Sequence, residues 1–143
     1  VTPDRAFAAL PRRRGRVAAV PQGRGDLGAR MRRALARSAT RPAVLIGGDI
    51  PGITARHIAE AFRRLRRHDL VFGPAEDGGF WLVGARPMRH LPAMFADVRW
   101  SSPGALADTL AGLPRRLSVG FAARLEDVDD GEAYRRLAPG RGF

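Results

Sequence analysis

Cysteine, lysine and long apolar runs are absent from this sequence of 143 residues. Without cysteine, the chain can form neither a disulfide nor a thiolate metal site, which fits a reducing cytoplasm. No apolar run reaches the roughly 18 residues that cross a membrane, and the first residues lack the charged and apolar regions of a signal peptide. The sequence therefore predicts a cytoplasmic protein without a membrane span.

The absence of lysine means that all 25 basic residues are arginine, and they give the chain a net charge of +11. No lysine can therefore act as base, nucleophile or phosphate ligand. Arginine pairs well with phosphate, which would suit a nucleic-acid-binding protein. The arginine clusters, however, fall on predicted helix faces and not in a basic tail interleaved with aromatic residues. A compositional bias explains them more simply, and nucleic acid is the weakest partner hypothesis.

Short apolar runs alternate with amphipathic stretches along the chain, which is typical of an α/β domain. The length suits one domain, residues 1–143, with a single core. Strands are expected at 17–20, 43–46, 69–73, 80–83 and 116–119, helices at 5–10, 26–38, 54–67, from 102 onwards and at 129–137, and a basic loop at 12–16. Ligands gather at the C-terminal ends of strands in open α/β sheets. Those ends carry the Gly- and Asp-rich stretches 22–28, 47–52 and 73–79, which we expect to cluster.

The stretch GGDIPG places Asp49 directly after an apolar strand. The preceding glycines, including Gly48, allow close backbone packing, and Pro51 makes the turn rigid. A carboxylate held there suits a hard cation such as Mg²⁺ or Mn²⁺. The alternative is that Asp49 caps the following turn, and the residues alone leave both interpretations open.

The stretch GPAEDGGFWLVG carries two adjacent carboxylates, Glu76 and Asp77, before Gly78 and Gly79. The two glycines allow a ligand to approach the backbone and leave amides free to bind an anion. The alternative is a tight hairpin between the flanking strands. The loop is long for a simple hairpin, which favours a functional role.

The stretch QGRGDLGARM leads into the N-terminus of a predicted helix, where free amides attract phosphate. The alternative is that its aspartate simply caps the helix. It is no P-loop, because the Lys-Ser/Thr pair is missing. The candidate ligand contacts here are Gln22, Gly23, Asp26, Gly28 and Arg30.

The acidic stretch LEDVDDGEAY is the fourth candidate. Asp129 and Glu132 have the spacing of a capping box, whereas Asp127 is a candidate second metal ligand. In the stretch WSSPG, the Ser-Pro pair predicts a helix start, and Trp100 with Ser101 could wall a pocket. The three histidines have no partner at metal-ligand spacing, so we expect them to pack or to lie at the surface.

These stretches, in their order and spacing, resemble a bacterial family related to glycosyltransferase A-type (GT-A) proteins, domain of unknown function 2064. The residues that carry the resemblance are QGRGDLGARM, VLIGGDIPGIT, HDLVFGPAEDGGFWLVG, WSSPGALADTL and LEDVDDGEAY. The resemblance implies a three-layer nucleotide-diphospho-sugar transferase fold, with helices on both faces of a mostly parallel sheet. It also implies that Asp49 holds a divalent metal on the nucleotide diphosphate.

Such proteins open with a strand, a basic loop and a helix that hold the nucleotide. No matching segment precedes Val1-Thr2-Pro3, so the chain is expected to be an N-terminally truncated domain. The leading hypothesis is a metal-dependent transferase that takes a nucleotide sugar or a nucleoside triphosphate and a small-molecule acceptor. Glu76 or Asp77 would position or deprotonate that acceptor. A non-catalytic nucleotide-binding remnant is the alternative, and a homo-oligomer remains open.

Overall fold

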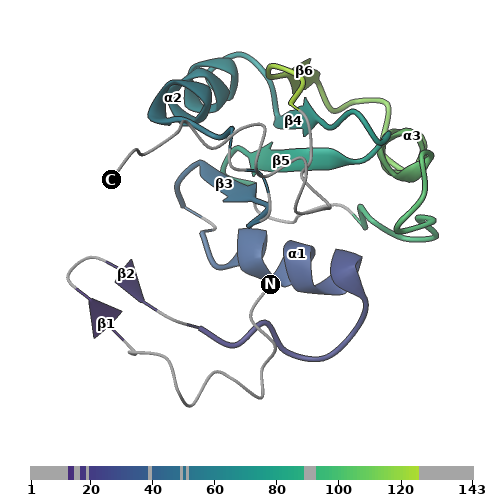
Figure 1. Cartoon of the computed structure of the whole chain (residues 1–143), viewed down its shortest axis with the longest axis horizontal. Helices are drawn as coiled ribbons and strands as arrows, with labels where there is room; N and C mark the ends of the chain where they lie inside the picture. The colour runs from purple at the N-terminus through teal and green to yellow at the C-terminus, as the bar shows by residue number, and fades with distance from the viewer. Residues whose placement is uncertain are drawn as a thin grey trace, which may run out of the picture.

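The computed structural model describes residues 13–14, 17–18, 20–38, 40–48, 50, 52–88 and 93–125. Its main body has three layers, with a sheet between helix α1 on one face and helix α2 on the other (Figure 1). This arrangement confirms the predicted α/β fold class. Three predicted site residues, Asp49, Pro51 and Asp127, lie outside the described residues, as do the helices expected at 5–10 and 129–137.

The main sheet has four strands in the order β3-β5-β4-β6. β5 runs antiparallel to both of its neighbours, whereas β4 and β6 are parallel. Three strands therefore point the same way and β5, which lies between two of them, opposes them. Because two of the three strand pairings are antiparallel, the described sheet is mixed and not mostly parallel as expected. The strands are β3 (Ala43–Ile46), β4 (Leu70–Pro74), β5 (Phe80–Ala85) and β6 (Val119–Phe121).

β4 and β5 form the hairpin that was the alternative interpretation of this stretch, because the two strands pair over most of their length. The connection closes with a hydrogen bond from the Ala75 amide to the Gly79 carbonyl at 3.1 Å. The pairing register shifts between Gly73 and Pro74. Proline has no amide hydrogen for the ladder, so an irregularity is expected there.

Side-chain caps begin two of the three helices among the described residues. Asp26 accepts a hydrogen bond from the Ala29 amide at 2.7 Å and starts α1 (Leu27–Ala36). Thr54 starts α2 (Ala55–Arg64), and its amide donates in return to the His57 ring at 3.2 Å. α3 spans Ala105–Ala111 and has no side-chain cap. For Asp26 the alternative interpretation, a helix cap, is therefore the one that the structure shows, and His57 has a structural role as expected.

Two apolar clusters fill the space on either side of the sheet. On one side, Leu35 of α1 packs with Phe72, Val83 and the buried Phe95, and residues of α3 join them. On the other side, Ala61 of α2 and its C-cap residue Leu65 pack with Val71, Trp81 and Leu82. Each α-helix therefore buries one apolar stripe against the sheet, which is the physical basis of the layered fold.

Two sequence predictions were wrong in their placement. The expected basic loop contains β1 (Arg13–Arg14), which pairs with β2 (Val17–Ala18) in a separate two-stranded sheet. The strand expected at 116–119 begins only at Val119, because Leu117 closes a turn on the Pro114 carbonyl. β6 then pairs with β4, about fifty residues earlier, and no local pattern reports that register.

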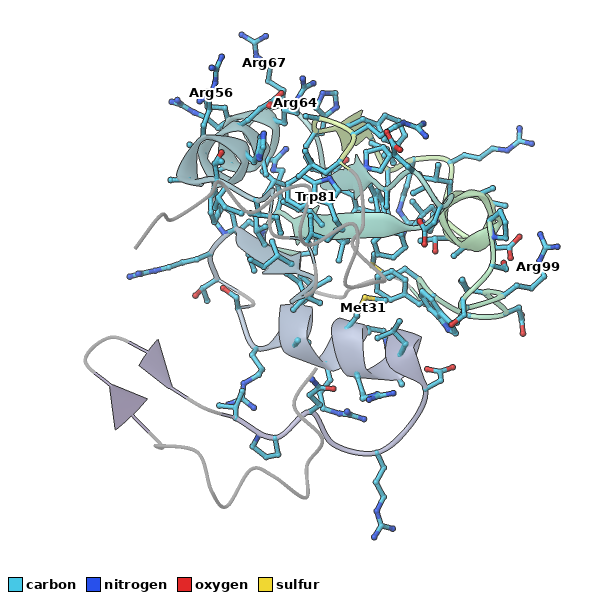
Figure 2. The ribbon with its side chains drawn as sticks, in the orientation of Figure 1. Met31, Arg56, Arg64, Arg67, Trp81 and Arg99 are labelled. Carbon is cyan, nitrogen blue, oxygen red and sulfur yellow. The ribbon has the colours of Figure 1, made fainter. Side chains whose placement is uncertain are left out.

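α2 and the turn that follows it carry exposed arginines, of which Arg56, Arg64 and Arg67 point away from the sheet (Figure 2). Arg64 forms an ion pair with Glu60 at 2.6 Å, the spacing of one helical turn. Among the described residues, no helix is both long enough and apolar enough to span a bilayer.

Candidate functional site

A cavity of about 740 Å³ lies between α1, the ends of β3 and β5, and the segment before α3. All three predicted strand-end stretches contribute to its wall, and so does the stretch WSSPG. The sequence places these stretches far apart, and the fold brings them together. The polar and glycine residues of the lining are Gln22, Arg30, Arg33, Arg37, Gly47, Gly48, Asp77, Gly79, Ser101 and Ser102.

The α1 wall is a row of three arginines at helical spacing, Arg30, Arg33 and Arg37. Arg33 donates to the carbonyls of Gln22 and Arg24, the latter at 2.7 Å. Arg30 donates to the Gln22 side chain and to the Asp26 carbonyl, both at 3.3 Å. The first two guanidiniums are thus held in place by the preceding loop.

Arg37 differs from its neighbours in the row. Its guanidinium forms no hydrogen bond or ion pair with any residue that the structure describes, and the residue is exposed at the cavity. A free guanidinium offers donors in a fork that matches phosphate or carboxylate oxygens.

The strand-end wall comes from the turn after β3 and the connection between β4 and β5. The Gly47 amide donates to the Trp81 carbonyl at 2.9 Å, which fixes the start of the turn. One carboxylate oxygen of Asp77 accepts from the Gly79 amide at 2.8 Å. Glu76 is exposed and is not part of the lining. The structure therefore separates the two adjacent carboxylates, and only Asp77 borders the cavity.

The third wall is the segment Trp100–Pro103, which we call the WSSP wall. Trp100 packs among rings, with centroid distances of 6.0 Å to Phe95 and 6.3 Å to Phe80. The buried Gly28 of α1 lies against Trp100 and Phe95, and a side chain there would collide with both. Trp100 is thus anchored while part of it borders the cavity.

An ion pair holds the WSSP wall to α3. The Arg99 side chain donates two hydrogen bonds of 2.8 Å to the Asp108 carboxylate, which also accepts from the Arg99 amide at 3.1 Å. These side-chain and backbone hydrogen bonds lower the pKa of Asp108 to about 2, and the same pairing raises the pKa of Arg99. The Ser102 hydroxyl adds a 2.6 Å bond to the Arg99 carbonyl.

The backbone around the WSSP wall is strained. Phe95, Asp97 and Ser101 have φ angles of 72°, 56° and 56°, in the left-handed region that side chains disfavour. Such conformations persist only where surrounding contacts impose them, and they concentrate at ligand-binding sites.

The cavity does not include every residue that the sequence suggested. Asp26 caps α1, Gly28 is buried under Trp100, and Gly78 supports the backbone of the opposite loop. Gly23 and Glu76 also lie outside the lining. The predicted residues that do line the cavity are Gln22, Arg30, Gly48, Asp77, Gly79, Trp100 and Ser101.

Sequence reasoning missed Arg33, Arg37 and Ser102 as lining residues. A signal was present for the arginines, because Arg30, Arg33 and Arg37 are spaced to share one side of a helix. No cluster of three or more His, Asp or Glu side chains that could hold a metal occurs within the described part of the chain. Three guanidiniums and one carboxylate therefore dominate the charge of the described cavity wall, which favours anions.

Comparison with known proteins places the chain in a family. Residues 1–102 match the family described as "Uncharacterized protein conserved in bacteria (DUF2064)". The chain belongs to this family. The match covers the α1 row, the turn after β3, the β4–β5 connection and the start of the WSSP wall, so the cavity is largely built from residues of the DUF2064 region.

A solved structure resembles this DUF2064 chain. It is the crystal structure of a "putative nucleotide-diphospho-sugar transferase" from Desulfovibrio desulfuricans G20, with 33% sequence identity and a TM-score of 0.69. The similarity covers 76% of this chain and 49% of that one, so this chain spans about half the length of the solved relative. No curated protein matches the sequence. The predicted nucleotide-diphospho-sugar transferase fold is thus confirmed.

Proposed function

We propose that this chain forms the donor-binding part of a glycosyltransferase that uses a nucleotide-diphospho-sugar and a divalent cation. The observation that carries the proposal is the cavity that the α1 arginine row and the strand-end loops line together. The resemblance to a protein described as a nucleotide-diphospho-sugar transferase supports the donor class.

The α1 row supplies the charge that a diphosphate needs. Arg30 and Arg33 are already held by the loop oxygens of Gln22, Arg24 and Asp26, so little side-chain freedom is lost when an anion binds. Arg37 contributes a guanidinium that has no partner among the described residues. Several exposed apolar side chains, Val20, Leu27 and Ile46, also line the cavity, and a ligand would cover them.

We propose Asp49 as the residue that holds Mg²⁺ or Mn²⁺. It follows Gly48, which lines the cavity at the end of β3. Mg²⁺ is commonly bound by one or two carboxylates together with substrate phosphates, so Asp49, with Asp127 as a second ligand, is a sufficient donor set. The cation, when bound, would neutralise charge on the leaving diphosphate.

Asp77 has the chemistry of a group that positions an acceptor hydroxyl. One of its oxygens accepts from the Gly79 amide, and the other forms no hydrogen bond with the described residues. A carboxylate fixed in this way can accept a hydrogen bond from an incoming hydroxyl and withdraw its proton. Glu76, which is exposed and does not line the cavity, does not share this role.

Calorimetry of the full chain tests the proposal. Nucleoside diphosphates, their sugars and nucleoside triphosphates would be titrated with Mg²⁺, with Mn²⁺ and with EDTA. We expect metal-dependent binding of at least one nucleoside diphosphate and its sugar, and a loss of the metal dependence in Asp49→Asn. Binding of triphosphates alone would indicate nucleotidyl transfer instead. A failure of every nucleotide to bind in the presence of metal would refute the proposal.

A further inference from the structure

The polar groups of the cavity differ from one wall to another. The α1 wall carries guanidiniums, whereas the residues that line the cavity from the WSSP wall and the β4–β5 connection carry hydroxyls, an indole and a carboxylate. This difference in chemistry divides the cavity into two subsites, because a group that suits one wall does not suit the other.

Three polar groups of the WSSP wall and the β4–β5 connection have no partner among the described residues. They are the Ser101 hydroxyl, the Trp100 Nε1–H and one oxygen of Asp77, and all three residues line the cavity. The neighbouring Ser102 hydroxyl, in contrast, is already bonded to the Arg99 carbonyl. The free set comprises one donor, one acceptor and one group that can do both.

This set selects against a phosphate. The Asp77 carboxylate would repel a phosphate oxygen at short range, because both groups carry negative charge. A neutral hydroxyl, however, can donate to Asp77 and can also accept from Ser101 or from the Trp100 indole. A ring that carries several hydroxyls matches this donor and acceptor pattern.

We propose that the WSSP wall with Asp77 is a subsite for an uncharged polyhydroxylated ring, next to the anion-binding α1 row. The inference rests on the proposed function and refines it, because it assigns the two chemically different parts of a nucleotide-diphospho-sugar to two walls. The ring is either the sugar of the donor or a hydroxylated acceptor, and the experiment below separates the two.

The Arg99–Asp108 ion pair positions the backbone of this subsite. Neither residue lines the cavity, yet the pair ties the backbone between Val98 and Ser102 to α3. Ser101 is held in the left-handed region within this tied segment, at φ 56°. Breaking the pair would release Ser101 to ordinary backbone conformations and would move its hydroxyl from the cavity.

The matched control for this pair is Glu60 with Arg64 on the far side of α2. That pair is also a carboxylate–guanidinium contact, at 2.6 Å, and its side chains are likewise partly exposed. It lies outside the cavity lining. Glu60→Gln and Asp108→Asn therefore remove comparable ion pairs, and only the second bears on the subsite.

The experiment has two arms, both measured by calorimetry with Mg²⁺ present. The donor arm compares the Kd of a nucleoside diphosphate with the Kd of its sugar derivative. The monosaccharide arm measures the Kd of a free monosaccharide with the nucleoside diphosphate bound. We expect the ring to increase the affinity in one of the two arms, and we call this increase the gain. Ser101→Ala and Trp100→Phe should each reduce that gain about five- to tenfold, with the Kd of the nucleoside diphosphate unchanged.

Asp108→Asn should reduce the same gain, and Glu60→Gln should leave it intact. A merely structural role of Asp108 would lower thermal stability without changing the ratio of the two affinities. A gain in the donor arm assigns the ring to the donor sugar, and a gain in the monosaccharide arm assigns it to an acceptor.

A nucleoside diphosphate that binds with no gain in either arm, or with a gain that all three variants retain, would overturn the subsite and leave the proposed function standing. A chain that binds no nucleotide at all would overturn both.

Discussion

Gly78 lies so close to Pro103 that a β-carbon on Gly78 would overlap the Pro103 carbonyl group. Its φ angle of 88° is also in the left-handed region. The carbonyl of Gly78 accepts from the Leu106 amide at 3.1 Å. This one glycine therefore joins the β4–β5 connection to the segment that precedes α3, and so connects two walls of the cavity.

Replacement of Gly78 tests this close approach. We expect Gly78→Ala to lower the free energy of unfolding by about 2 kcal/mol or more, because the left-handed conformation alone costs about 1–2 kcal/mol with a β-carbon and the collision adds to it. Urea unfolding measures the change. Gly52→Ala is the control, since nothing lies within 4 Å of its β-carbon position. Equal stability of the two variants would contradict the packing described.

The hydrogen bonds between Ser118 and Asp69 predict that the stability of the fold changes with pH. The Asp69 carboxylate accepts from the Ser118 amide at 2.9 Å and from its hydroxyl at 2.8 Å, and these bonds, with a smaller contribution from Arg86, lower the pKa of Asp69. A lowered folded-state pKa means that the stabilisation is present above the unfolded value near 3.8 and is lost as the pH falls through the folded value.

Thermal unfolding between pH 6 and pH 2 measures this effect. The stability difference between the parent chain and Asp69→Asn should be largest above pH 4 and should shrink as the pH falls. Glu76→Gln is the control, because Glu76 is exposed and forms no ion pair with the described residues. A difference that stays constant over the whole range would show that the carboxylate charge of Asp69 contributes nothing.

Substitutions of Asp26 test whether this residue caps α1 or contacts the nucleotide. Asp26→Ala should cost about 1 kcal/mol of stability, as the loss of an N-cap usually does, and should leave nucleotide affinity within a factor of about two. Asp26→Ser, which retains a capping oxygen, should recover most of the stability. A large loss of nucleotide affinity in Asp26→Ala without a loss of stability would instead make Asp26 a ligand.

Local chemistry explains which parts of the fold were predictable. Asp26 and Thr54 cap their helices through amides three residues away, so the sequence holds the whole interaction. β6 was misplaced because its register depends on Leu70 of β4, which no nearby residue encodes. The β4–β5 connection was posed as either a hairpin or a functional loop, whereas it forms a hairpin whose loop also lines the cavity.

In the candidate site, too, local patterns were predictable and tertiary contacts were not. Gly47 and Gly48 were identifiable because a strand end followed by glycine is a local pattern. Gly28 was expected to meet a ligand, but it meets Trp100 instead, a contact set by tertiary packing. The predicted role of Asp49 remains a prediction, since that residue lies outside the described part.

Arg37 provides the cleanest test of the α1 row. Arg33 also holds the loop carbonyls of Gln22 and Arg24, so its replacement would disturb the fold as well as the site. Arg37 lines the cavity without such bonds. Arg37→Gln should therefore weaken the binding of a nucleoside diphosphate about tenfold, the usual effect of losing one charge-assisted hydrogen bond, with thermal stability unchanged.

Arg67→Gln is the matched control for Arg37→Gln. It removes the same charge from the chain, but Arg67 follows α2 and points away from the sheet (Figure 2). A general effect of net charge on anion binding would weaken both variants equally, and such an effect would decline with added salt. A specific contact in the cavity would weaken Arg37→Gln alone and would persist at 0.3 M salt. Equal affinities of the two variants would therefore remove Arg37 from the phosphate site and leave the charge of the α1 row to Arg30 and Arg33.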